Sequence, residues 1–298
     1  MRKRVALGLG AALLVGGLAA EVGVRVAGLV DFPLYDADAT IGYIPKANQR
    51  GSFLNKNDWV INEKHMGAET FVPDPAGNIL LVGDSIVWGG NPYALPDRLG
   101  PRLQALVKGK VWPIAAGSWS LQNQLAYLNA NPDVVSRVDT IVFVLNSGDL
   151  GPPSSWNCSL THQRERSTVA LIYLAKKYVL RWPCEGTPAE LQLKTQDPLV
   201  MLRDFLTLNP TRRVVFLLYP DKPELLNPKL LRARMRPLEV GLAAAGANEV
   251  VAVAADARWR TAAGLYKDGI HPSLEGMRVL ATIVRDALAR QAAPGPRP

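Results

Sequence analysis

The 298-residue sequence has few of the side chains that form zinc motifs, because it contains only two cysteines and three histidines. His65, His162 and His271 lie far apart in the chain, and Cys158 and His162, which are four residues apart, lack the further His or Cys residues that would complete a zinc motif. The sequence therefore predicts no metal site, and we expect no cofactor.

Internal repeats and long polar tracts are also missing, which argues against a solenoid and against a largely disordered chain. With 48% hydrophobic and 20% charged residues, the composition is that of an ordinary globular protein. A chain of this length can form one well-packed domain with extensions. Only the tail 292–298 has an unstructured composition.

The charge excess is small once the N-terminus is set aside. The formal net charge is +8, but residues 1–30 hold four Arg or Lys and one Glu, so +3 belongs to this segment and +5 to the rest. This balance disfavours nucleic acid as a partner. A mildly basic exterior suits an anionic polysaccharide or an anionic membrane surface.

The N-terminal segment 1–30 has the pattern of an export signal: the basic stretch Met1–Arg4 precedes an apolar run over 5–20. Sixteen residues are fewer than the roughly 20 that span a bilayer, and Gly17-Leu-Ala19 is an acceptable cleavage site. However, residues 22–30 continue apolar, which favours a retained anchor over a cleaved peptide. Either form places the protein in the periplasm, at the cell surface or, after cleavage, outside the cell.

Export also bears on the two cysteines. Cys158 and Cys184 lie in one segment of the chain, and thiols in an oxidising compartment tend to pair. We predict a disulfide between them, with two buried, unpaired thiols as the alternative.

Apolar runs alternate with helical stretches through most of the chain, which predicts an α/β fold. Continuous apolar strands joined by long crossovers form a parallel sheet covered on both faces, and such sheets bind ligands beyond the carboxyl ends of the strands. The five predicted strands are 78–82, 110–115, 140–145, 213–218 and 249–253.

Two regions flank or interrupt this pattern. Residues 31–76 are rich in Gly, Pro and Asn, and predict an extended, partly β leader packed on a core domain over 77–291. Residues 151–200 form a long insertion in that domain. Such an insertion builds a substrate wall in some enzymes, and a helical cap without substrate contact is the alternative.

The first predicted strand ends in Gly83-Asp84-Ser85, and a serine directly after a buried strand is exposed above the sheet, as in other nucleophile elbows. Near the far end, Asp268-Gly-Ile-His271 precedes a predicted helix over 274–290. Serine needs a base to take its proton, and imidazole needs a carboxylate to fix its tautomer. We therefore predict Ser85 as nucleophile, His271 as base and Asp268 as the acidic partner. Each residue alone could equally be a loop polar group or a helix cap.

Together these motifs resemble the conserved blocks of the SGNH (GDSL-type) hydrolases, over residues 78–290. The resemblance implies a three-layer α/β/α, flavodoxin-like SGNH fold with a five-stranded parallel sheet. It also implies an oxyanion hole formed by the backbone N–H of Ser85, the N–H of a second-block glycine, here Gly117, and a third-block asparagine side chain.

The third block departs from the family pattern Gly-x-Asn-Asp, because the chain reads Asn146-Ser-Gly148-Asp149. Asn146 either reaches the oxyanion hole from its shifted position, or the hole consists of the Ser85 and Gly117 N–H groups alone.

Three functions fit the resemblance. The first is a serine esterase that deacylates an envelope or exported carbohydrate. The second is a polysaccharide O-acetyltransferase, which would need a membrane-bound acyltransferase as partner. The third is a non-catalytic glycan-binding or assembly protein, and the intact Ser85, Asp268 and His271 count against it.

Overall fold

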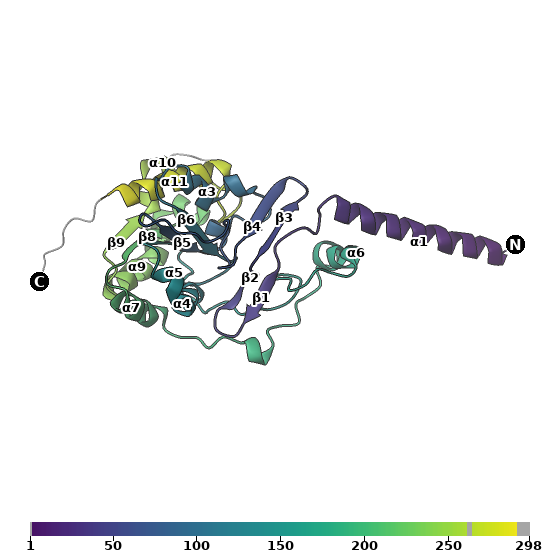
Figure 1. Ribbon diagram of the computed structural model, residues 1–298, viewed down its shortest axis with the longest axis horizontal. Coiled ribbons are helices and arrows are strands. Elements are labelled where there is room, and N and C mark those ends of the chain that lie inside the picture. The colour runs from purple at the N-terminus through teal and green to yellow at the C-terminus, as the bar shows by residue number, and fades with distance from the viewer. Residues whose placement is uncertain (1, 261–263, 291–298) are drawn as a thin grey trace, which may run out of the picture.

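A five-stranded parallel sheet forms the centre of the molecule in the computed structural model, which describes residues 2–260 and 264–290 (Figure 1). Its strands lie in the order β6-β5-β7-β8-β9. Numbered within the sheet this is 2-1-3-4-5, the flavodoxin-like order. The strands are β5 (Ile79–Gly83), β6 (Val111–Ala115), β7 (Thr140–Leu145), β8 (Arg213–Leu218) and β9 (Glu249–Ala252). The predicted α/β fold and parallel sheet are confirmed.

Helices cover both faces of this sheet and complete three layers. Alternate residues of β5 point to opposite faces, so that Leu80 and Val82 join one core cluster, whereas Ile79 and Leu81 join the other. The first face is covered by α4 (Leu121–Ala130), α5 (Pro132–Val135), α7 (Pro198–Leu208) and α9 (Pro228–Ala244). The second is covered by α2 (Ser85–Trp88), α3 (Leu99–Gln104), α10 (Ala257–Arg260) and α11 (Leu274–Ala289). A short α8 (Lys222–Leu226) precedes α9.

Two antiparallel hairpins precede the sheet in the chain. They are β1 (Tyr35–Asp38) with β2 (Gly42–Pro45), and β3 (Gln49–Phe53) with β4 (Asn57–Ile61). The first hairpin packs on the turn that follows β6: Tyr43 donates its hydroxyl to the Gly117 carbonyl at 2.5 Å, and Trp119 Nε1 donates to the Tyr43 carbonyl at 2.8 Å. The leader thus contacts the carboxyl edge of the sheet.

The N-terminus forms a long helix, α1 (Arg2–Val26), which projects from the folded body (Figure 1). Its residues Leu7–Val26 have a mean hydropathy of 1.8 and are not buried against the rest of the chain. This helix is longer than the apolar run over 5–20, because it continues through Glu21 and Arg25. By length and composition it can cross a membrane, as an anchor or an export signal would.

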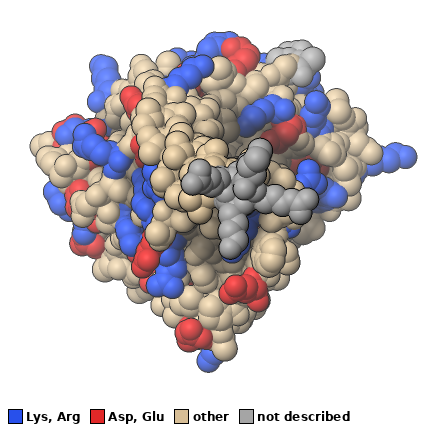
Figure 2. Space-filling model, turned by 90° about the vertical axis from the view of Figure 1, so that its right-hand side faces the viewer, with Lys and Arg blue, Asp and Glu red and all other residues tan. Residues whose placement is uncertain are grey.

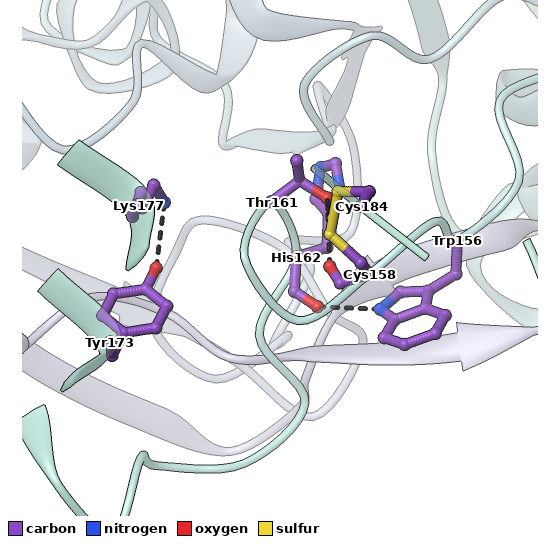
Figure 3. Close-up of a disulfide and its surroundings, with 7 residues drawn as sticks. All are labelled: Trp156, Cys158, Thr161, His162, Tyr173, Lys177 and Cys184. Carbon is purple, nitrogen blue, oxygen red and sulfur yellow. Dashed lines mark hydrogen bonds between the residues drawn. A yellow bond between two sulfur atoms is a disulfide. The ribbon is translucent and has the colours of Figure 1, made fainter. Parts of the chain in front are cut away.

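The segment 151–200 contains little regular structure apart from α6 (Ala170–Leu174) and the π-helical turn η2 (Ala175–Val179) that continues it. The predicted disulfide between Cys158 and Cys184 is present, and it joins the two halves of the segment (Figure 3). Trp156 lies beside it and donates its Nε1–H to the His162 carbonyl at 2.7 Å. The tail 292–298, predicted to be unstructured, lies outside the described residues.

Candidate active site

Ser85 is the first residue of α2 and follows β5 after a single connecting residue, Asp84. The turn is tight, because a Cβ added to Gly83 would lie 2.5 Å from Val87 Cγ2. Asp84 caps the short helix by accepting the Ile86 N–H at 2.8 Å, and the helix ends at Gly89 in the left-handed region (φ 73°). The strand, cap and glycines therefore hold the Ser85 side chain at the carboxyl end of β5.

His271 lies 186 residues after Ser85 in the chain, and its ring contacts both Ser85 and Asp268. His271 Nε2 lies 3.0 Å from Ser85 Oγ, and His271 Nδ1 lies 2.8 Å from Asp268 Oδ2. With the proton on Nδ1 donated to Asp268, Nε2 is free to accept the proton of Ser85. The structure thus brings the three predicted residues together in the order that a serine nucleophile needs.

Asp268 is held as a carboxylate. Partial burial opposes ionisation, but hydrogen bonds from the Ile270 and His271 backbone N–H groups and from the His271 ring prevail, and lower the pKa of Asp268 to about 2. A carboxylate in this position keeps the imidazole oriented and stabilises its protonated form.

Two tyrosines from other elements hold the loop that carries these residues. Tyr219, which follows β8, donates its hydroxyl to the Ile270 carbonyl at 2.6 Å, and Tyr93 donates to the Pro272 carbonyl at 2.7 Å. Because both carbonyls flank His271, these bonds fix the backbone on either side of the base. The sequence motif gave no indication of either tyrosine.

Gly117 and Ser85 occupy equivalent positions beyond the ends of the neighbouring strands β6 and β5. Gly83 pairs with Ala115 in the parallel register of β5 and β6, and Ser85 and Gly117 each follow two residues later. Within the described part of the chain, neither the Ser85 nor the Gly117 backbone N–H donates to a protein acceptor. The open space beside the Gly117 Cα leaves room for a ligand atom. This arrangement suits two donors of an oxyanion hole.

Asn146 directly follows β7 and contacts the residue before the nucleophile. Its Nδ2 donates to Asp84 Oδ2 at 3.0 Å, its backbone N–H donates to Asp149 Oδ2 at 2.7 Å, and its Oδ1 accepts the Gly148 N–H at 2.8 Å. The side chain is therefore brought to the site despite its shifted place in the motif. Its role as a third oxyanion donor stays a prediction.

Sequence reasoning missed the two carboxylates that Asn146 connects. Asp84 and Asp149 are only 4% and 2% exposed, and lie close enough for their charges to interact. Burial raises the pKa of Asp84 to about 6, and burial together with the Asp84 charge raises that of Asp149 well above its usual value. Their positions in the turns that follow β5 and β7 were the available signal, because Asp84 comes directly after β5 and Asp149 comes four residues after the end of β7.

The raised pKa of Asp84 predicts a pH-dependent stability. The folded state holds a proton on Asp84 more tightly than the unfolded chain does. The protonated Asp84 therefore contributes fully to the free energy of unfolding below about pH 4, and this contribution is lost as pH rises through about 6. Asp84→Asn removes one titrating group. We expect the melting temperature of wild type minus that of Asp84→Asn to be larger near pH 4 than near pH 8, measured by thermal unfolding. A constant difference would contradict the raised pKa.

Asn146→Ala tests the third donor. If the free N–H of Asn146 Nδ2 stabilises the oxyanion, kcat for an ester should fall by about 100-fold with little change in KM. Asn209→Ala, at the C-terminal end of α7, is the matched control. Full activity in Asn146→Ala would mean that the hole consists of the Ser85 and Gly117 N–H groups alone.

Within residues 2–260 and 264–290, no three His, Cys, Asp or Glu side chains are grouped so that they could hold a metal ion.

The insertion 151–200 comes close to the segment that follows Ser85. Its residues Thr161, Gln163 and Lys177 line a cavity of about 110 Å³ together with Trp88 and other residues. The insertion therefore packs near the end of α2, the helix that begins with Ser85.

No protein-family model matches the sequence, and no curated protein is similar to it. Solved structures similar to the chain include a member of the lipolytic protein G-D-S-L family from Veillonella parvula (13% identity, TM-score 0.42, 72% of this chain and 99% of that one). They also include the esterase EstA from Pseudoalteromonas sp. (12%, 0.42, 71% and 96%) and the acetyl xylan esterase Est2A from Butyrivibrio proteoclasticus (14%, 0.40, 73% and 64%). At identities of 12–14% this likeness concerns the fold alone.

Proposed function

We propose that the protein is a serine esterase of the SGNH type that acts through an acyl-enzyme. The observation that carries this proposal is the continuous contact from Asp268 through His271 to Ser85, beside the free N–H groups of Ser85 and Gly117. A nucleophile, its base and donors for the developing charge are the groups that acyl transfer requires.

In the first half of the reaction, Ser85 Oγ attacks the ester carbonyl while His271 Nε2 takes the hydroxyl proton. The carbonyl oxygen becomes an oxyanion that the Ser85 and Gly117 N–H groups stabilise. His271 then gives its proton to the leaving alkoxide, which departs as an alcohol. In the second half, His271 deprotonates a water that attacks the acyl-enzyme, and the acid and free Ser85 are released.

The proposed substrate is an acylated carbohydrate of the cell envelope or an exported polysaccharide. The support is location: α1 has the composition of an anchor or export signal, and the disulfide fits an oxidising compartment. Tryptophan rings can stack on sugars, but the tryptophans of this chain support a carbohydrate substrate less than its location does. Trp88 and Trp119 pack in the core at 8% and 1% exposure, and only Trp156 and Trp182 lie in the insertion.

The protein would lie outside the cytoplasm with α1 retained as its membrane anchor. The basic residues Arg2–Arg4 would then remain on the cytoplasmic side, as the positive-inside rule requires.

Acetate release from an O-acetylated polysaccharide by the full-length protein tests the function. An esterase releases acetate whether or not an acceptor oligosaccharide is present. An O-acetyltransferase, acting with a membrane acyltransferase that supplies its acetyl groups, would instead place acetyl on the acceptor. If neither product forms and p-nitrophenyl acetate is also left intact by folded protein, the esterase proposal is wrong and a glycan-binding role replaces it.

A further inference from the structure

A strip of apolar and aromatic side chains on the insertion faces solvent beside the base of α1. The strip spans residues 169–182, and its members are between 40% and 77% exposed: Val169, Ile172, Tyr178, Val179, Leu180 and Trp182. Six large apolar side chains within fourteen residues exceed the scattered exposure that is normal at a protein surface, and such patches mark interaction sites.

This strip is fixed to α1 by charged hydrogen bonds. The Glu21 carboxylate accepts the backbone N–H groups of Ala170 and Leu171 at 2.8 and 2.9 Å, and therefore caps α6. Arg25 pairs with Glu21 at 2.7 Å and donates to the Thr168 carbonyl at 2.9 Å. The insertion therefore has a defined position along α1, which Figure 1 shows as α6 lying next to the inner end of the long helix.

The length of α1 relates this position to the surface of a membrane that the helix would span. The apolar stretch Leu7–Val26 has 20 residues, about 30 Å of helix and the thickness of a bilayer core. Glu21 and Arg25 lie in its last two turns, at the end opposite to Arg2–Arg4. If α1 spans the bilayer, the strip is therefore held where the hydrocarbon core meets the outer headgroups.

The composition of the strip fits the same location. Trp and Tyr are enriched at the interfaces of membranes, and Lys side chains extend from apolar surface to the headgroups. Here Lys176 Nζ lies 5.6 Å from the ring centre of Trp182, and the exposed residues Tyr178, Val179 and Leu180 lie between them in the chain. Figure 2, which views the side from which α1 projects, shows mainly uncharged surface near the centre of this side, with Lys and Arg side chains interspersed with Asp and Glu around it.

We propose that residues 169–182 lie on the outer membrane–water interface beside α1, as a second contact between the protein and phospholipid. This inference rests on the proposed anchoring by α1. The proposed membrane contact bears on substrate choice, because Lys177 of the same segment lines a cavity together with Trp88, the last residue of the helix that begins with Ser85. With both α1 and residues 169–182 in contact with the membrane, the side of the enzyme that carries this cavity would face the membrane. This orientation would favour substrates close to the membrane surface.

The experiment uses full-length protein in phosphatidylcholine and phosphatidylglycerol vesicles. A polarity-sensitive fluorophore is attached through Leu180→Cys, and in a control through Leu208→Cys. Both leucines face solvent, at 61% and 78% exposure, and Leu208 lies in α7. The native cysteines form a disulfide, so each variant carries a single free thiol. Unchanged p-nitrophenyl acetate turnover checks that both labelled proteins are folded.

We expect the labelled protein to float with the vesicles, and nitroxide-labelled lipid to quench the Leu180→Cys probe several-fold more strongly than the Leu208→Cys probe. Flotation with equally weak quenching at both positions overturns the inference while leaving the anchor intact, and a partner protein would then be the occupant of the strip. Protein that remains active but does not float shows that the anchoring has failed, and the inference fails with it.

Discussion

Ser85→Ala is expected to lower kcat for p-nitrophenyl acetate by about 1,000-fold or more, because loss of one member of a serine triad removes the covalent route. In this structure no other hydroxyl among the described residues contacts His271 Nε2. Initial rates of nitrophenol release by wild type and variant measure the effect.

The matched control is Ser136→Ala. Ser136 precedes β7 and so lies at the amino end of the sheet, away from the site, and its hydroxyl donates only to the Asp133 carbonyl. This variant should keep full activity, and the melting temperature of Ser85→Ala should confirm that the protein is folded. Equal rates for wild type and Ser85→Ala would assign the turnover to another residue.

Asp268→Asn is expected to lower kcat by about 10,000-fold while leaving the fold unchanged. An amide at this position can donate to His271 Nδ1, which places the imidazole proton on Nε2, where it can no longer accept the Ser85 proton. The carboxylate oxygen that accepts the Ile270 and His271 N–H groups is retained as the amide oxygen, so the loop keeps these bonds.

Glu275→Gln serves as its control, because Glu275 is an exposed carboxylate nearby that pairs with Arg278. It should leave kcat unchanged. A loss of less than about tenfold in Asp268→Asn would mean that the base is oriented by groups other than Asp268, such as the backbone bonds from Tyr219 and Tyr93 on either side of it.

The sheet could be predicted from the sequence because β5, β6, β7 and β8 are largely buried on both faces, whereas the edge strand β9 is partly exposed. All five strands are largely apolar runs, and the predicted strand 140–145 matches β7 residue for residue. The nucleophile and the base could be predicted for a similar reason. Ser85 follows the end of a strand after one residue. Asp268 and His271 are three residues apart, so that local spacing already places these two within contact distance.

The remaining features depend on contacts between distant segments. Tyr43 reaches the Gly117 carbonyl across 74 residues of chain, and Asn146 reaches Asp84 across 62. Glu21 caps α6 across 149 residues. No periodicity or short motif encodes such pairs, because they form only when segments that are distant in the chain come together in the folded protein.

The most direct test of the central claim is covalent labelling with a fluorophosphonate. Attack by Ser85 Oγ on phosphorus releases fluoride and leaves a stable phosphonyl-serine, which intact-protein mass spectrometry detects. We predict one adduct per chain, mapped to the peptide that contains Ser85, lost in Ser85→Ala and strongly slowed in Asp268→Asn. Folded protein that takes up no label, or that takes it up equally in Ser85→Ala, would contradict Ser85 as the nucleophile.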